Sequence, residues 1–508
     1  MKKFLSILLA TMMVLAMVGT AFADFTITAP DSTVEHTYYV YQIFTGTMSD
    51  DATNKALGDL KWGTDAKLPS GVDVGDNVTD DQLATLKALE STASDATKLA
   101  VMLNYVNLDS TTYGTVTSGS TLTVEPGYYL ITDSDAESDN PLTDKDEAAT
   151  THLVKVCANI TIQPKTAKPS VDKKVQDEND DAELTAVNGW GETADHEINE
   201  SFQFKLIATL PADEDFEAYK EYKVVFTDTM SSGVTFESIE SVTVDSAVVA
   251  VADYSHTATA GQAGGSWTLT IDDIKKYDTD LTDGAVVEVV YNAHLNENAE
   301  VTTAAGGTTN SNKVELQFSN NPYTEGLGKT GPDYVWVYTF QINNTKYKEA
   351  TTDGNQLAGA GFTLYDAAGT TISLIDKGNG LYVVADQDAT ENIVTEMVTG
   401  DTGVFNIKGL DAGTYTIEET TVPAGYNKCD NVVIEIEAVH AENTEGTAPT
   451  TTLTMTPAQS INYINKQGAS LPETGGIGTT LFYLFGGIMA AGSALILIVR
   501  RRADAEEE

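Results

Sequence analysis

The feature that most restricts the fold is a two-residue alternation of apolar side chains that recurs along much of the chain. Apolar residues take every second position in 202–206 (FQFKL), 287–291 (VEVVY) and 314–318 (VELQF). Successive side chains of a strand point to opposite faces, so this period predicts strands with one face in a core. Gly-rich turns separate short segments of this kind, and little of the chain has helical spacing. The pattern predicts an all-β fold built of β-sandwiches.

Length and charge narrow the class of protein further. The chain has 508 residues, 41% of them apolar, which suggests three or four domains with ordinary hydrophobic cores. Its net charge of −46 argues against nucleic acid as a partner, because a DNA binder needs cations to displace phosphate counterions. The charge fits an extracellular surface exposed to salt and water. A generic acidic, solvated surface explains it equally well, so charge alone selects no partner.

The chain has too few cysteines for disulfide bonds to stabilise the fold. Only Cys157 and Cys429 occur, far apart in the sequence, whereas a disulfide-rich secreted protein would have more. If the chain is secreted and needs reinforcement, a bond other than a disulfide must provide it.

The N-terminus has the order of a secretory signal peptide. Lys2 and Lys3 precede an apolar run at 4–18, and the small-x-small sequence AFA ends at Ala23. This order predicts a cleaved signal peptide at 1–23 and a mature chain that begins near Asp24. An uncleaved N-terminal membrane anchor is the alternative.

The C-terminus combines LPETG at 471–475, an apolar stretch at 477–499 and three arginines. A helix of that length spans about 35 Å, which suffices for a bilayer, and the arginines favour the cytoplasmic side. This order resembles the cell-wall sorting signal read by sortases, which cleave after the Thr of the motif and pass that residue, here Thr474, to an amine. A plain single-pass membrane protein is the alternative.

Boundaries between domains are marked by prolines and turn residues. The stretch 164–169 (PKTAKP) separates a first domain from a second, and a linker at 320–332 separates the second from a third. One helix is expected, since 79–82 (TDDQ) is a capping box followed by leucines at helical spacing. The full division is a signal peptide at 1–23, domains at 24–165, 170–320 and 334–466, and a sorting region at 471–508 with its transmembrane segment at 477–499.

Two motifs resemble ligand sites but lack the required context. The segment 326–331 (GLGKTG) matches GxGxxG, yet a proline and a strand follow instead of a helix, which favours a flexible linker. Asp177, Asn179 and Asp181 imitate the start of a calcium loop, but Ala182 stands where an EF-hand needs glycine. A solvated acidic loop is favoured there, and a looser calcium site is the alternative. We expect no cofactor, no metal ion and no turnover active site.

The third domain carries three polar residues with the parity of core positions. Lys346, Glu419 and Asn465 each alternate with apolar residues on their predicted strands. Burial lowers the pKa of a lysine and raises that of an acid, so both become neutral. Neutral Lys346 could then attack the Asn465 carboxamide while Glu419 moves protons, which forms an isopeptide bond and releases ammonia. A buried Lys–Glu ion pair, or a solvent-facing Lys346, is the alternative.

Two segments of this domain resemble a known family. The sequences LAGAGFTLY at 357–365 and IEETTVPAGY at 417–426 resemble the Cna-B-type domains of SpaA-type, sortase-assembled pilins of Gram-positive bacteria. The resemblance implies that Lys346 and Asn465 form the cross-link and that Glu419 is the catalytic acid. Val422 departs from the alanine usual in the family.

The second domain resembles the middle domain of the same pilins. VDKKV looks like its opening strand, and parity with the valines selects Lys173 over Lys174. NKVELQFSNNP looks like its last strand, with Asn312 at the cross-link position and Asn320 as the alternative. FTDTMSSG resembles the strand that bears the catalytic acid, which implies Asp228; this is the least constrained of the three assignments.

The end of the first domain, ITIQPK, resembles the pilin motif WxxxVxVYPK, whose lysine receives the next subunit. Val156 replaces the Trp, Gln163 replaces the Tyr, and isoleucines replace both valines, whereas the proline and Lys165 are kept. An exposed lysine at a boundary suits attack on a sortase thioester. Lys168 is the alternative acceptor. The remaining alternative is that Lys165 is an ordinary solvated lysine with no part in assembly.

Together, the resemblance implies three tandem immunoglobulin-like or Cna-type β-sandwiches in the secreted, wall-anchored backbone subunit of a pilus (fimbria) that supports adhesion. The implied partners are a class C pilus sortase, the housekeeping sortase, further copies of the chain and peptidoglycan, with accessory pilins and a host surface ligand as open additions. The protein would not be a turnover enzyme. A monomeric wall-anchored adhesin is the alternative, and a secreted wall enzyme would need a catalytic cleft that the sequence does not indicate.

Overall fold

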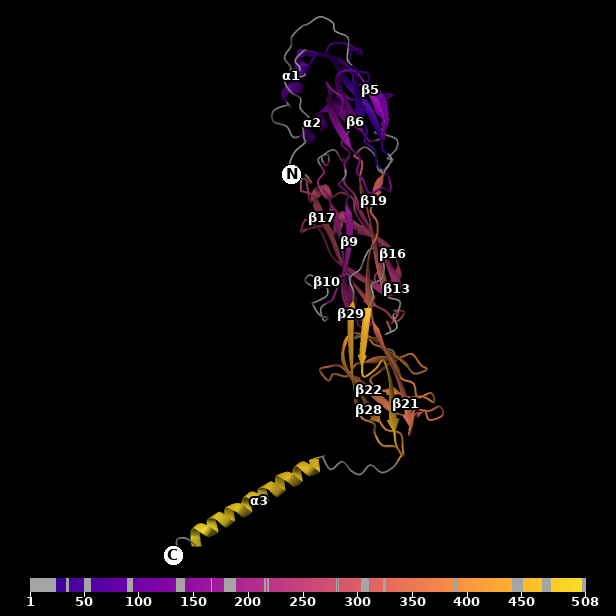
Figure 1. The fold of residues 1–508 in the computed structure, drawn as a ribbon, viewed down its shortest axis with the longest axis vertical. Helices are drawn as coiled ribbons and strands as arrows, with labels where there is room; N and C mark the ends of the chain where they lie inside the picture. Colours follow the sequence, from indigo (N-terminus) through magenta and orange to yellow (C-terminus); the bar gives the residue numbers. More distant parts are fainter. Residues whose placement is uncertain are drawn as a thin grey trace. The chain divides into compact units, whose positions relative to one another are not determined.

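In the computed structural model, strands make up most of the chain, which confirms the all-β prediction (Figure 1). The structure describes residues 24–32, 36–49, 56–88, 95–133, 142–165, 167–177, 189–213, 216, 219–279, 281, 283–302, 310–322, 326–386, 392–440, 451–467 and 477–504. The expected signal peptide at 1–23, most of the calcium-like loop and the LPETG motif with Thr474 lie outside these residues.

Two compact units divide the chain, and each is described by itself. Unit 1 comprises Met1–Gln341, Gly409–Ala412 and Ile436–Thr454, and unit 2 comprises Ile342–Lys408, Gly413–Glu435 and Met455–Glu508. The three domain ranges expected from the sequence remain a prediction.

Unit 1 begins with two small sheets. Their strand orders are β5-β1-β8 and β3-β2-β6-β7, with β4 on β2. The strands are β1 Phe25–Thr28, β2 Thr37–Met48, β3 Leu57–Trp62, β4 Gly114–Thr117, β5 Thr121–Val124, β6 Gly127–Thr132, β7 Thr151–Val156 and β8 Ile160–Thr161. All six residues of β6 are buried, because Tyr129 and Ile131 pack into one apolar cluster while Tyr128 and Leu130 pack into another.

Two helices cover the second of these clusters, beside β6 in Figure 1. Helix α1, Asp80–Ala88, starts at the expected capping box: the Thr79 amide donates to Gln82 Oε1 at 3.0 Å, and the Gln82 amide donates to Thr79 Oγ1 at 3.4 Å. Helix α2, Asp95–Met102, was not expected from the sequence because it is short; it buries Leu99 and Met102.

A twelve-stranded sheet system follows, in the order β10-β9-β12-β17-β13-β18-β20-β11, with β14, β15, β16 and β19 attached. The strands are β9 Ser170–Gln176, β10 Trp190–Gly191, β11 Thr193–Asp195, β12 Ser201–Leu210, β13 Val224–Val244, β14 Ala247–Val248, β15 Tyr254–His256, β16 Gln262–Ile271, β17 Ala285–Leu295, β18 Asn310–Ser319, β19 Leu327–Lys329 and β20 Asp333–Tyr338. Buried and partly exposed residues alternate in β12 and β18, as the apolar period predicts.

The segment 326–331 is not the flexible linker expected from the sequence. It contains β19, which pairs antiparallel with β18. A side chain at Gly328 would lie 2.7 Å from both the Lys145 carbonyl oxygen and Phe318 Cζ, so the glycine permits close packing rather than flexibility. The linker prediction failed because residues outside the motif, Lys145 among them, make these contacts.

Unit 2 holds the remaining strands, some of which continue into the segments of unit 1 named above. Their orders are β25-β23-β24-β27-β21-β31 and β26-β22-β28-β29-β30. The strands are β21 Phe340–Lys348, β22 Gly361–Tyr365, β23 Leu374–Asp376, β24 Leu381–Val384, β25 Ile393–Val394, β26 Met397–Val398, β27 Asn406–Leu410, β28 Gly413–Thr421, β29 Val432–His440, β30 Thr451–Thr456 and β31 Ser460–Asn465.

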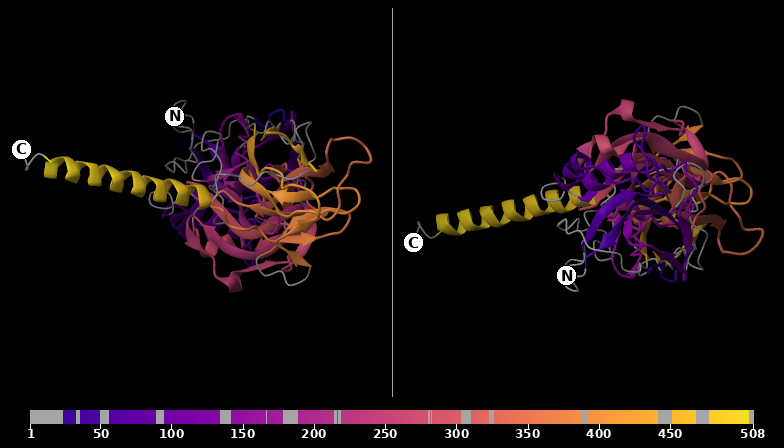
Figure 2. Two further views of the ribbon diagram at one scale, coloured as in Figure 1. Left: turned by 90° about the horizontal axis from the view of Figure 1, so that it is seen from below. Right: turned by 90° about the horizontal axis from the view of Figure 1, so that it is seen from above.

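The C-terminal segment is one continuous helix, α3, Ile477–Asp504 (Figures 1 and 2). It contains the apolar stretch 477–499 and the arginines that follow. A search of the described residues finds no helix with the length and apolar character of a membrane span. A transmembrane segment at 477–499 remains a prediction.

Candidate functional sites

Unit 2 brings Lys346, Glu419 and Asn465 together in its core. Lys346 on β21 pairs with Tyr463 on the parallel strand β31, so Asn465, two residues further along, lies on the same face. Lys346 Nζ donates to Asn465 Oδ1 and lies 3.0 Å from Glu419 Oε1. Asn465 Nδ2 donates to that same Oε1 at 2.7 Å. All three side chains are buried, so amine, acid and amide meet away from water.

Aromatic rings and a cysteine surround this cluster. Lys346 Nζ lies 5.2 Å from the centroid of the Phe362 ring, and Phe362 stacks on Phe405 with 4.1 Å between centroids. The Cys429 amide donates to Glu419 Oε2 at 2.8 Å, and Lys346 Nζ lies 3.3 Å from Cys429 Sγ. Burial raises the pKa of the Cys429 thiol to about 11. The sequence offered no signal for Cys429 beyond its place shortly after 417–426.

Unit 1 contains a second buried cluster, around Lys173 on β9. Lys173 Nζ donates to Asp228 Oδ2 on β13. Asp228 lies opposite Val314 of β18 and Met230 opposite Asn312, so Asp228 and Asn312 share one face of their strands. Lys174, by contrast, pairs with Asp172 and Glu192, and its side chain is 23% exposed.

Tyr291 on β17 joins the members of this second cluster. Its hydroxyl donates to Asp228 Oδ2 at 3.1 Å, accepts from Asn312 Nδ2 at 2.5 Å and accepts from Lys173 Nζ at 3.3 Å. Sequence reasoning missed this residue as a functional group. The available signal was its parity with the valines of VEVVY, which places a hydroxyl among core side chains.

Burial controls the charge state of the second cluster. It lowers the pKa of Lys173 and raises the pKa of Asp228, in each case against the attraction between the two groups. Burial also raises the pKa of Tyr291 well above its usual value, so the phenol keeps its proton. A neutral amine beside a neutral acid is the state that nucleophilic attack on an amide requires.

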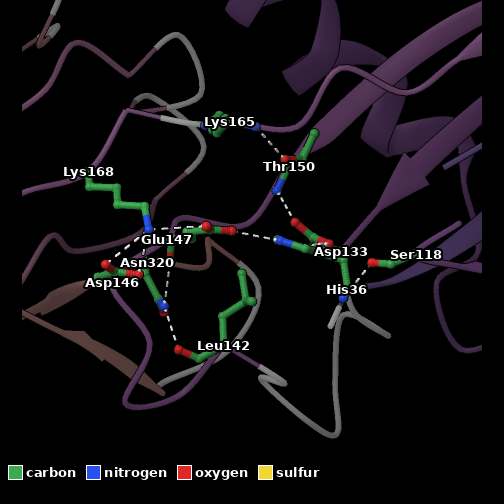
Figure 3. Close-up of polar contacts among 10 residues, drawn as sticks. All are labelled: His36, Ser118, Asp133, Leu142, Asp146, Glu147, Thr150, Lys165, Lys168 and Asn320. Atoms are coloured by element: carbon green, nitrogen blue, oxygen red, sulfur yellow. Dashed lines mark hydrogen bonds and ion pairs between the residues drawn. The ribbon is translucent and has the colours of Figure 1, made fainter. Parts of the chain in front are cut away.

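Asn320, the alternative to Asn312, does not join the Lys173 cluster. Its buried Nδ2 donates to the Leu142 carbonyl at 2.9 Å and to the Glu147 carbonyl at 3.0 Å (Figure 3). The structure thus places the Asn320 amide on the backbone of Leu142 and Glu147 and not beside Lys173.

The two candidate acceptor lysines lie in different surroundings. Lys165 Nζ pairs with Asp213, the Lys165 amide donates to Thr150 Oγ1 at 2.9 Å, and its side chain is 21% exposed. Lys168 Nζ lies 3.0 Å from Asp146 and 3.2 Å from Glu147, and its side chain is 42% exposed (Figure 3). The expectation of a freely exposed Lys165 is therefore wrong: it is largely covered and ion-paired.

His36 contacts two acidic residues, Asp133 and Glu147, and Glu147 in turn contacts Lys168. Its Nδ1 lies 3.0 Å from Asp133 Oδ1 and its Nε2 lies 2.8 Å from Glu147 Oε2 (Figure 3). Asp133 Oδ2 also accepts from the Thr150 amide at 2.6 Å. Burial alone would lower the pKa of His36, but the two carboxylates outweigh it and raise that pKa.

Within the described ranges, no group of three or more acidic, histidine or cysteine side chains could hold a metal ion.

Comparisons with solved structures give several pilins. The T6 backbone pilin of Streptococcus pyogenes serotype M6 is 17% identical, with a TM-score of 0.47, over 89% of this chain and 100% of that one. The full-length major pilin SpaD of Corynebacterium diphtheriae is 17% identical, with a TM-score of 0.44, over 88% and 98%. BcpA, the major pilin subunit of Bacillus cereus, is 15% identical, with a TM-score of 0.41, over 89% and 100%. No curated protein matches the chain.

Two protein families match parts of the sequence. Residues 342–450 match SpaA, the prealbumin-like fold domain, and residues 463–506 match the LPXTG cell wall anchor motif. The first match contains Lys346 and Glu419, and the second contains Asn465 and Thr474. The chain is thus a cell-wall-anchored surface protein and a sortase substrate, with a SpaA-type prealbumin-like domain at 342–450.

Proposed function

We propose that this protein is the repeating backbone subunit of a sortase-assembled pilus, stabilised by two internal isopeptide bonds. The observation that carries the proposal is the pair of buried Lys–acid–Asn clusters, each of which joins distant parts of the chain. A protein that forms a surface fibre and has no disulfide framework needs covalent bonds of another kind, and these clusters could form them. Class C and housekeeping sortases, other copies of the chain and peptidoglycan are the proposed partners; the protein performs no turnover reaction.

The proposed bond-forming reaction is the same in both clusters. The lone pair of the neutral lysine Nζ attacks Cγ of the asparagine, and the acid assists by giving a proton to the carbonyl oxygen. One proton passes from Nζ to Nδ2, the C–Nδ2 bond breaks, and Nδ2 leaves as ammonia. As the carbonyl re-forms, its oxygen returns the proton to the acid, which ends as it began. No oxidant or external cofactor enters this balance.

Loop closure explains how such a bond stabilises the fold. Lys346 and Asn465 are 119 residues apart. By the chain-entropy estimate for disulfides, closing a loop of that size restricts the unfolded chain by about 4–5 kcal/mol. The bond also cannot be reduced, unlike a disulfide.

Polymerisation is proposed to join Thr474 of one subunit to Lys165 of the next. Lys165 is ion-paired with Asp213, so transfer requires that the pair opens and the amine attacks without its extra proton. Lys168 remains the competing acceptor, and its greater exposure is the observation in its favour.

Coexpression with a pilus-type sortase tests this function. We expect a ladder of multimers that resists sodium dodecyl sulfate, and we expect Thr474→Ala to abolish it. Lys165→Arg should also abolish the ladder while monomers still reach the wall, because guanidinium is a poor nucleophile. Lys168→Arg is the matched control and should keep the ladder. If the control loses the ladder and Lys165→Arg keeps it, the acceptor is Lys168. If the intact chain forms no ladder, the backbone role is wrong and a monomeric wall-anchored adhesin remains.

A further inference from the structure

The two clusters differ in how the acid reaches the amide. In unit 2, Glu419 Oε1 accepts directly from Asn465 Nδ2 at 2.7 Å. In unit 1 the acid is an aspartate, one methylene shorter. Among the described residues, Asp228 hydrogen-bonds to Lys173 and Tyr291, and its other oxygen has no partner. The Asn312 nitrogen bonds to Tyr291 instead.

We propose that Tyr291 is a catalytic residue of the unit 1 cluster, which carries a proton between Asp228 and the departing nitrogen of Asn312. The inference rests on the proposed isopeptide bond and adds a residue to that reaction. It follows from one hydroxyl that contacts the acid, the amide nitrogen and the attacking amine at once. In this view aspartate plus tyrosine spans the distance that the longer glutamate spans alone.

The relay conserves protons and electrons. Lys173 Nζ attacks Asn312 Cγ, and the new C–N bond converts the flat amide into a tetrahedral centre. In the amide, Nδ2 can only donate a hydrogen bond; in the tetrahedral centre it has a lone pair that accepts a proton. Asp228 gives its own proton to the Asn312 carbonyl oxygen, and its Oδ2 takes the proton that Nζ must lose. Tyr291 gives its hydroxyl proton to Nδ2 and receives one from Asp228. The C–Nδ2 bond then breaks, ammonia leaves, and the re-formed carbonyl returns its proton to Asp228.

The surroundings of Tyr291 suit this role. The side chain is fully buried, and its ring packs edge-on against Trp267 with 5.1 Å between centroids. The ring centroids of Phe204 and Phe236 lie 5.3 Å and 5.7 Å from that of Tyr291. This packing fixes the hydroxyl in place, and proton transfer gains most when the groups are already positioned. The Asn312 carbonyl oxygen has no partner among the described residues, so it is free to receive the proton of the acid.

Tyr291→Phe tests the relay in the full-length chain. Peptide mass mapping should show the Lys346–Asn465 cross-link at the wild-type level. Formation of the Lys173–Asn312 cross-link after a pulse of synthesis should be slower by roughly 100-fold, within the usual range for general acid–base catalysis. Tyr463→Phe is the matched control. Tyr463 packs 5.0 Å from Phe362 beside the other cluster, but its hydroxyl has no partner within the described structure. Its removal should leave both cross-links unchanged.

A rescue variant separates catalysis from structural support. In Tyr291→Phe with Asp228→Glu, the longer acid can approach Asn312 directly and occupy the space of the lost hydroxyl. We expect this double variant to regain the Lys173–Asn312 cross-link, which a merely structural tyrosine would not allow. If Tyr291→Phe lowers the melting temperature severely, the double variant decides alone.

The outcomes are distinguishable. A Tyr291→Phe chain that forms the unit 1 cross-link at the wild-type rate overturns the relay, and so does a double variant that stays unlinked. If the wild-type chain itself contains no Lys173–Asn312 cross-link, the proposed bond fails, and the relay fails with it.

Discussion

Asn465 donates its Nδ2 hydrogen to Glu419 Oε1 over 2.7 Å, which places the acid on the atom that the proposed reaction releases as ammonia. The same oxygen lies 3.0 Å from Lys346 Nζ. One carboxyl group therefore serves both the nucleophile and the leaving group, and its removal should stop bond formation without a large change in shape.

We predict that Glu419→Gln and Asp228→Asn each prevent one cross-link. The wild-type protein, after its signal peptide is removed, should weigh two molecules of ammonia less than the mass calculated from the sequence of that processed chain, and each variant one molecule less. Glu419→Gln should also lose about 4–5 kcal/mol of unfolding free energy through the opened loop. Intact mass and thermal melting measure both effects. A wild-type mass equal to that of the unmodified mature sequence would contradict the prediction.

The choice between Asn312 and Asn320 gives a second prediction. Asn312→Ala should abolish the Lys173 cross-link. Asn320→Ala should keep it and instead destabilise unit 1 by about 1–3 kcal/mol, because the Leu142 and Glu147 carbonyls lose a buried donor. Peptide mapping together with denaturant unfolding separates the two variants. A cross-linked peptide that contains residue 320 would reverse the assignment.

His36 should make stability depend on pH. Its pKa is raised in the folded protein by Asp133 and Glu147, with the Tyr38 ring stacked on its imidazole. A raised pKa means that the ion pairs stabilise the fold fully below the unfolded pKa, about 6.5, and that this contribution is lost as pH rises through the folded pKa. We expect His36→Gln to lower the melting temperature most at pH 5–6, and progressively less as the pH rises further. A difference that grows with pH would contradict this.

Cys429 should be a slow target for alkylation in the folded protein. A thiol with a pKa of about 11 has roughly 100-fold less thiolate at neutral pH than one at 9.0, and only the thiolate reacts. Mass spectrometry of iodoacetamide adducts at pH 7 tests this, with the urea-unfolded chain as the reference. Cys429→Ala should keep the Lys346–Asn465 cross-link, because its contact with Glu419 Oε2 comes from the backbone amide.

Strand parity accounts for what could be predicted from the sequence. The alternation in β12 and β18, and the choice of Lys173 over the partly exposed Lys174, depend only on neighbours along one strand. Tyr291 was missed because its three polar partners lie on three other strands, and no local pattern encodes that meeting. The close packing at Gly328 and the ion pair of Lys165 with Asp213 were not predicted from the sequence, for the same reason.

The parallel pairing of β21 with β31 has a mechanical consequence. The chain enters the sheets of unit 2 along β21 and leaves them along β31, and these two strands run in the same direction. A pull on the two ends therefore shears the strands lengthwise and loads their hydrogen bonds together rather than one by one. With the proposed Lys346–Asn465 bond in place, tension would cross from one strand to the other through a single covalent link. Residues 347–464 would then lie outside the load path, and the subunit could not lengthen by unravelling them.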